Sequence, residues 1–197
     1  MGTGLSMDGA GQVVGGHAAL AACFALYLAW WCIFFRPGDA RPQGALRAVG
    51  IGCIVAAAVL GAVGVALCCA GMARLPRRIV TLANWQVALM GVVAYVALFV
   101  ITTIPFDREP TTELVIIVGW ATLEAATVNA LYGAGALGPG AALALLLVML
   151  ALAAASLVCY VRFYDLSGWA ALIDGSVPLA CGIAYAIALA VVVALLR

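Results

Sequence analysis

The stretch that decides the fold is residues 111–132, which read TTELVIIVGWATLEAATVNALY. It is long enough to cross a bilayer as a helix, since a spanning helix needs about 20 mainly apolar residues. Near its middle stands a carboxylate, Glu124, and the stretch contains no basic residue to pair with it. An acid at the bilayer centre costs about 3 kcal/mol on insertion scales, so such residues usually mark functional sites. Glu124 is therefore the first candidate functional residue.

The rest of the chain is equally apolar. Of its 197 residues, 68% are hydrophobic and 9% are charged, whereas a soluble domain carries about 25% charged residues. Hydrophobic runs follow one another with short connections, and no soluble-looking block of comparable size separates them. The sequence therefore predicts an all-α integral membrane protein that consists of a single domain.

We expect six transmembrane helices in a compact bundle, with boundaries set by aromatic clusters, arginine-rich turns and loops that contain glycine or proline. Residues 166–177 are too short and too polar for a seventh span, and Pro178 is expected to open the last helix. The predicted organisation is a flexible N-terminal tail at 1–16 and a six-helix domain at 17–197, with helices at 17–35, 45–72, 79–104, 111–132, 141–163 and 178–196.

A shift of 90 positions (120 − 30) reveals an internal similarity. Because each half would hold three helices, the two halves would be inverted repeats, as in many transporters. The matched positions are Trp30 with Trp120, Cys69 with Cys159, Tyr95 with Tyr185, and Asn84 with Asp174. Chance matches are frequent among apolar residues, so the inverted repeat is a hypothesis.

Glu124 has polar neighbours on its own predicted helix. At 100° per residue, Trp120 and Thr127 fall on the same stripe as Glu124, and so does Glu113, whereas Asn129 lies off it. Two roles fit this pattern. Glu124 is either a binding or proton-coupling group in a pathway, which we favour, or a structural acid that is hydrogen-bonded to Asn84, Thr127 or a tyrosine.

Further polar positions come from the other helices. Asn84 and Gln86 stand near the start of the third predicted helix, and Asp174 stands before the last one. We favour a helix-capping role for Asn84 and Asp174, although broken helix ends of this kind also hold substrates or ions. The candidate pathway or binding residues are Glu124, Thr127, Trp120, Asn129, Asn84, Gln86, Asp174, Tyr95 and Tyr185.

Composition excludes most cofactor chemistry. The chain has no lysine for a Schiff base, and a single histidine, His17, which makes bis-histidine haem and three-ligand zinc sites improbable. We expect His17 to be an interfacial residue at the start of the first helix. The seven cysteines form no C-x-x-C pair, so we expect no metal and no cofactor. An enzyme is the less favoured interpretation, because neither a serine elbow nor a nucleotide-binding motif is present.

The arginines divide five to four between the two sides of the predicted topology, so they set no orientation. The sequence therefore leaves open a weakly set topology or insertion both ways with antiparallel pairing.

The function that we expect is a small channel or carrier for a small polar solute or ion, with Glu124 in the pathway. One alternative is a non-transporting membrane subunit or interaction module with a structural acid, and a weaker one is a lipid enzyme that uses Glu124 and Asp174. The expected partners are the lipid bilayer, the solute and a second copy in a homo-oligomer, but no nucleic acid. We expect the plasma (inner) membrane. In size and helix number the chain resembles the six-helix urea and amide channels, a likeness of architecture that carries no residues over.

Overall fold

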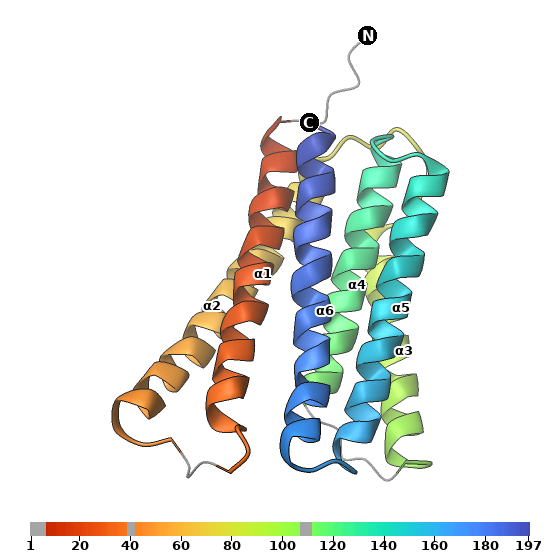
Figure 1. The fold of residues 1–197 in the computed structure, drawn as a ribbon. Coiled ribbons are helices and arrows are strands. Elements are labelled where there is room, and N and C mark those ends of the chain that lie inside the picture. The colour runs from red at the N-terminus through yellow and green to blue at the C-terminus, as the bar shows by residue number, and fades with distance from the viewer. Residues whose placement is uncertain (1–6, 39–41, 107–111) are drawn as a thin grey trace.

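The computed structural model describes residues 7–38, 42–106 and 112–197, and this part of the chain is helical with short connections. Its six helices are each long and apolar enough to cross a membrane, which confirms the predicted fold class in that form. They run alternately up and down, so that the beginning of α1 and the C-terminus lie at the same end (Figure 1). The helices are α1 (Met7–Phe34), α2 (Gly44–Arg74), α3 (Asn84–Thr103), α4 (Thr112–Gly133), α5 (Pro139–Phe163) and α6 (Gly168–Leu195).

The first helix begins ten residues earlier than predicted. We expected a loose tail up to residue 16, but α1 starts at Met7, and Ala10 and Val13 are fully buried. Glycine-rich sequence is a weak helix former in isolation, yet in membranes small residues let two helix backbones approach closely. The tail prediction is therefore wrong for residues 7–16, while residues 1–6 lie outside the described part.

The last helix is also longer than predicted. Pro178 was expected to open it, but α6 begins at Gly168 and contains Pro178 in its interior. A proline without an N–H leaves the carbonyl four residues earlier, that of Asp174, without its helical donor. Packing of the surrounding turns outweighs this local defect, so residues 168–177, which were expected to precede the last helix, form its first turns.

The third helix begins at Asn84, five residues later than predicted. The segment before it is held against the end of α4, because the N–H groups of Arg78 and Ile79 both donate to the carbonyl of Gly133, at 2.8 and 2.9 Å. These bonds satisfy backbone groups that would otherwise form a helical turn. Residues 107–111 lie outside the described part of the chain, and the remaining helix ends agree with prediction within two residues.

A glycine-rich face of α2 packs against α1. A Cβ atom placed on Gly71 would lie 2.8 Å from the Gly9 carbonyl and the Val13 nitrogen, and one on Gly64 would lie 2.9 Å from the Gly16 carbonyl. Since side chains cannot approach backbone this closely, only glycine permits the observed contact. The α1–α2 contact is thus a close helix pair of the kind that small residues allow in membranes.

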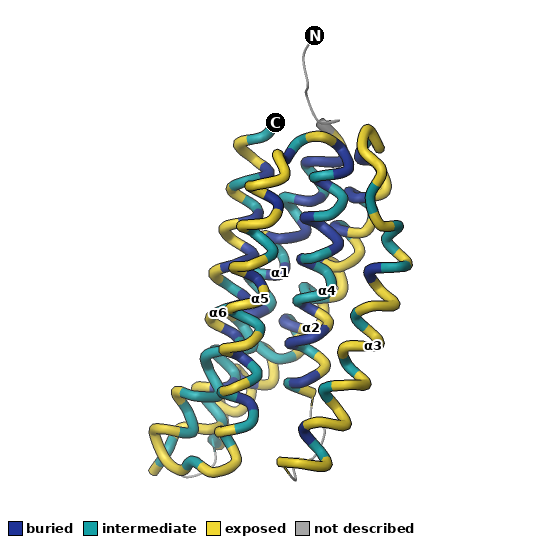
Figure 2. Tube along the Cα trace, turned by 90° about the vertical axis from the view of Figure 1, so that its right-hand side faces the viewer, coloured by how far each residue is buried: buried dark blue, intermediate teal, exposed yellow. Residues whose placement is uncertain are grey.

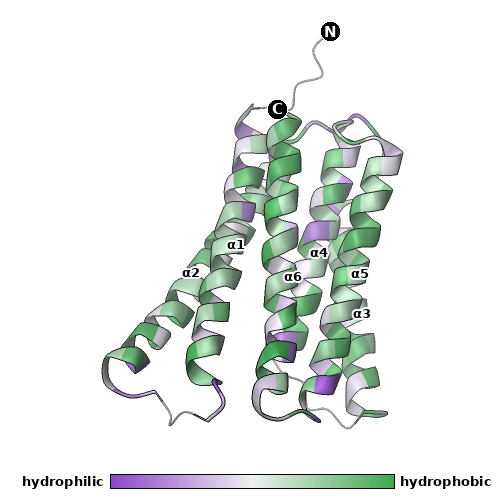
Figure 3. Cartoon of the chain, in the orientation of Figure 1, coloured by the Kyte–Doolittle hydropathy of each residue, from purple (hydrophilic) through white to green (hydrophobic). Residues whose placement is uncertain are grey.

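Helix α4 lies at the centre of the bundle. Figure 2 shows buried positions along most of α4, whereas α3 is exposed over most of its length. Hydrophilic positions gather mainly at the helix ends, apart from turns within α1 and α4 (Figure 3). A helix whose apolar side chains are exposed in this way is suited to face lipid, so α3 forms the outer wall and α4 carries the candidate site.

The predicted inverted repeat would require equivalent helix pairs in the two halves. Helix α5 packs along α6, but the corresponding pair, α2 and α3, makes at most marginal contact in the described residues. The structure therefore does not establish the repeat, which stays a prediction.

Candidate functional site: a buried histidine–glutamate pair

The centre of the site is a pair that joins the first and fourth helices. His17 Nε2 lies 2.9 Å from Glu124 Oε2, and both side chains have no exposed surface. His17 stands ten residues after the start of α1, and Glu124 stands nine residues before the end of α4. At 1.5 Å per residue both are about 15 Å from the same end of the bundle, which is close to the middle of a 30 Å bilayer.

The hydrogen bond made by the second ring nitrogen, Nδ1, determines which tautomer His17 adopts. Nδ1 lies 2.8 Å from the Val13 carbonyl oxygen. A carbonyl oxygen only accepts hydrogen bonds, so Nδ1 carries a proton and donates it there. The Cys68 sulfur lies 3.5 Å from the same nitrogen and is a weak second acceptor.

This tautomer determines the chemistry of the pair. One proton lies between Nε2 and Oε2, either on the ring, as imidazolium with carboxylate, or on the carboxyl group, as neutral imidazole with carboxylic acid. Both arrangements have zero net charge, so the pair is tolerated in a low-dielectric interior. Gain or loss of a proton would leave a net charge at the same place, where isolated charges are costly. The pair can therefore couple protonation to a rearrangement of the helices.

Several predicted residues surround the pair. Trp120 lies on the same face of α4 as Glu124 and packs edge-on against Tyr185 of α6, with ring centroids 5.8 Å apart. Thr127 is fully buried and donates to the Leu123 carbonyl at 2.9 Å. The predicted stripe along α4 thus brings together Glu124, Trp120 and Thr127, and α6 adds Tyr185.

Two polar atoms at this site have no hydrogen-bond partner among the described residues. They are Glu124 Oε1 and Trp120 Nε1. Buried polar groups are nearly always satisfied by protein or by ordered water. An acceptor on the carboxyl group and a donor one helical turn away offer complementary sites for a water molecule or a polar solute atom.

The amide residues of the predicted pathway lie elsewhere. Asn129 donates to the Leu82 carbonyl at 2.8 Å, and Gln86 accepts from the Ala83 N–H at 2.8 Å. Both bonds organise the segment that leads into α3. Asn84, the first residue of α3, lines a small cavity with Asn129 there. The structure separates these three side chains from the Glu124 pair, and the hydrogen bond weighed between Glu124 and Asn84 is absent from the described contacts.

Asp174 and Tyr95 also lie away from the pair. Asp174 stands inside α6, so the expected capping role is wrong, because the helix begins six residues earlier. Tyr95 packs with Leu114 and Tyr160 in a separate cluster between α3, α4 and α5. Neither residue contacts Glu124 in the described structure.

His17 is the functional residue that sequence reasoning missed. It was assigned to the membrane boundary because the helix was expected to start there. The signal lies in the spacing of Ala10, Val13, His17, Leu20 and Phe24, all of which are buried on one side of α1. Extended to residue 7, this helical stripe places His17 at membrane depth, where Glu124 is the natural partner.

Comparisons with protein-family models, curated proteins and solved structures find no match to this chain. Among the described residues, no group of three or more histidine, cysteine, aspartate or glutamate side chains is arranged to hold a metal ion. The geometry of the pair is therefore the feature of the molecule from which a function can be inferred.

Proposed function

We propose that the protein is a small membrane carrier for a small polar solute or ion, in which the pair of His17 and Glu124 couples solute movement to protons. The observation that carries this proposal is the fully buried contact of 2.9 Å between the two side chains, across two helices that are each long and apolar enough to cross a membrane. Ionisable residues at that depth commonly belong to proton relays and ion pathways.

Full burial favours a carrier over an open channel. Neither side chain has exposed surface, so in this conformation a solute cannot reach the pair through an open aqueous path. A carrier exposes its central site alternately to the two sides through movement of helices. In the proposed carrier, this conformation would be a closed state of such a cycle.

The pair supplies a physical reason for that movement. A neutral pair holds α1 against α4, whereas a net charge at the same depth favours hydration and separation of these helices. Proton exchange at the pair is thereby linked to the position of α1.

The test uses purified protein in sealed vesicles that contain a pH-sensitive dye. Ammonium and alkylammonium ions, amides, amino acids and polyols are added one class at a time across an imposed proton gradient. We expect one class to cause proton movement that His17→Gln and Glu124→Gln abolish, because glutamine keeps hydrogen-bonding capacity but does not titrate. Ser156→Ala is the matched control, since the equally buried Ser156 hydroxyl bonds only to its own helix, at Leu152.

The alternative is a non-transporting membrane subunit or interaction module in which the pair simply fastens α1 to α4. Complete burial of both side chains is consistent with such a structural contact. Absence of solute-dependent proton movement across the panel would favour it, as would uptake that both glutamine variants leave unchanged. Residence in the plasma (inner) membrane and assembly as a homo-oligomer belong to the proposal as well.

A further inference from the structure

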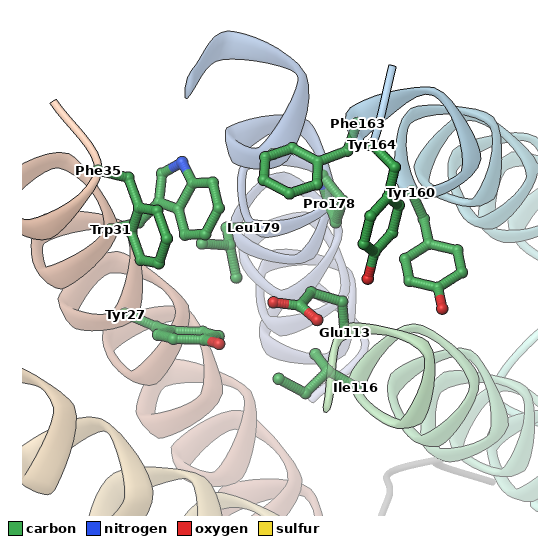
Figure 4. Close-up of a pocket in the computed structure, with 11 residues that line it drawn as sticks. Tyr27, Trp31, Phe35, Glu113, Ile116, Tyr160, Phe163, Tyr164, Pro178 and Leu179 are labelled. Carbon is green, nitrogen blue, oxygen red and sulfur yellow. The ribbon is translucent and has the colours of Figure 1, made fainter. Parts of the chain in front are cut away.

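A second site lies at the opposite end of the bundle from the beginning of α1. A cavity of about 150 Å³ opens between the end of α1, the start of α4, the end of α5 and the first turns of α6. Six aromatic side chains at the ends of two helices line it, as Figure 4 shows. They are Tyr27 and Trp31 of α1, Phe35 just after α1, Tyr160 and Phe163 of α5, and Tyr164 just after α5. Trp31 faces the protein and is buried.

The aromatic wall is held in place by specific contacts. The Trp31 indole N–H donates to the Leu172 carbonyl at 3.0 Å, and the ring stacks on Phe35 with a centroid distance of 4.1 Å. Phe163 closes the wall from α5, with its centroid 5.6 Å from that of Trp31. A Cβ atom at Gly175 would collide with the Trp31 ring, so glycine at this position of α6 is what admits the indole. The cavity is therefore largely formed before any ligand binds.

One charged side chain enters this aromatic space. Glu113, in the first turn of α4, lines the cavity, and no arginine is among the lining residues that the structure describes. In Figure 4 the carboxylate of Glu113 and the hydroxyl of Tyr27 face the enclosed space between the aromatic groups. The faces of aromatic rings carry negative electrostatic potential, and a carboxylate adds to it. The cavity is thus both apolar and electronegative.

We propose that this cavity binds an alkylated ammonium ion. Aromatic faces attract a cation within about 6 Å of a ring centroid and at the same time shelter its alkyl groups from water. The Glu113 carboxylate supplies the opposite charge. We take the cavity as the entry site for the solute, so alkylated ammonium ions are the substrate class of the proposed carrier, and this part of the inference rests on the proposed function. Binding of the ion to the cavity does not itself depend on transport.

Other ligand classes fit less well. Ca²⁺ and Mg²⁺ need about six oxygen ligands, and Glu113 is the only carboxylate among the lining residues. An anion would meet both the carboxylate and the negative ring faces. A neutral apolar molecule would leave Glu113 without a counter-charge in a partly dry site, which costs free energy.

The alkylated ammonium group can come from two sources, because the cavity lies at the helix ends, where lipid headgroups gather. A trimethylammonium group arrives either as a free ion, such as choline, or on a phosphatidylcholine headgroup. Both would use the same aromatic rings and the same carboxylate. Lipid composition distinguishes them, since phosphatidylglycerol carries no ammonium group.

The experiment measures equilibrium binding of radiolabelled choline to the full chain in phosphatidylglycerol nanodiscs. The competitor is 3,3-dimethyl-1-butanol, which has the shape of choline but carbon in place of the charged nitrogen. We expect saturable binding that the neutral alcohol does not displace. Glu113→Gln and Tyr27→Leu should each weaken binding at least about tenfold, and Tyr27→Phe should restore it because the ring is kept. Asp8→Asn, which removes an exposed acid at the other end of α1, should bind as wild type.

Three results would overturn the site: no saturable choline binding, equal displacement by the neutral alcohol, or unchanged affinity in both Glu113→Gln and Tyr27→Leu. A repeat in phosphatidylcholine nanodiscs assigns the source, because weaker binding of free choline there indicates that the lipid headgroup occupies the cavity. Choline binding without proton-coupled uptake in vesicles would refute the carrier but leave the site standing. Proton-coupled uptake of another solute class, without choline binding, would refute the site and leave the carrier.

Discussion

Replacing both members of the buried pair should harm the protein less than the two single replacements together. In His17→Leu the Glu124 carboxyl group would face an apolar side chain, and in Glu124→Leu the imidazole would do so. In the double variant no buried polar group at this contact loses its partner. The reason for this pattern is the 2.9 Å contact between two side chains without exposed surface.

The magnitude follows from what each single change leaves behind. Removing one partner of a buried ion pair costs about 3–5 kcal/mol, and leaving a neutral polar group unsatisfied costs about 1–3 kcal/mol. Because one proton is shared within a neutral pair, we expect each single variant to lose about 2–4 kcal/mol of stability. Hydrogen bonds between membrane helices couple by up to about 1.7 kcal/mol. Because both side chains are fully buried, an interaction free energy near the upper end of that range, about 1.5 kcal/mol, is expected from the double-mutant cycle.

The assay is equilibrium unfolding in mixed detergent micelles with increasing dodecyl sulfate, followed by helical circular dichroism for all four members of the cycle. His17→Leu combined with Ser156→Ala is the control, because these positions share no partner and their effects should add within about 0.5 kcal/mol. If the effects of His17→Leu and Glu124→Leu are additive within that same limit, the two side chains do not interact and the reasoning fails.

Three other predictions concern packing and transport. Gly71→Ala should cost about 1–3 kcal/mol of stability in the same unfolding assay, because its Cβ would meet α1 backbone at 2.8 Å. Gly52→Ala, which has open space around it, should be neutral, and equal effects of the two variants would refute the close α1–α2 contact. Tyr185→Phe removes the hydrogen bond from the Tyr185 hydroxyl to the Leu145 carbonyl, 3.0 Å long, and should cost about 0.5–1.5 kcal/mol, whereas no change would show that this link between α6 and α5 is unimportant. In sealed vesicles, Glu113→Gln should raise the choline concentration needed for half-maximal uptake but keep proton coupling at saturating choline. Glu124→Gln should abolish proton coupling. Loss of coupling in both variants would contradict the separation of the two sites.

The spans could be predicted because a bilayer imposes length and apolarity on every crossing helix. Two predicted helix boundaries are wrong at places where the local sequence has low helix propensity. The glycine-rich start of α1 and Pro178 in α6 are poor helix sequence, yet packing makes both helical. A prediction from local helix propensity therefore misplaced the starts of α1 and α6, although it gave the right number of helices.

Only the part of the site that lies on a single helix, α4, could be predicted from the sequence. The cost of a buried acid identified Glu124, and the helical period found Trp120 and Thr127 beside it. Helical period does not say which helices touch, so the contact with His17, 107 residues earlier in the chain, could not be derived. The aromatic cavity around Glu113 was missed for the same reason, since its walls come from four helices.

The most direct test of the proton-coupling pair is nitrogen nuclear magnetic resonance of histidine-labelled protein in lipid vesicles. His17 is the only histidine, so every labelled signal comes from the site. The account predicts that Nδ1 stays protonated, that Nε2 lies within dipolar contact of the Glu124 carboxyl carbon, and that the Nε2 signal changes with pH while the protein remains folded. An unprotonated Nδ1, or an Nε2 signal that stays constant across that whole range, would contradict a pair that exchanges protons.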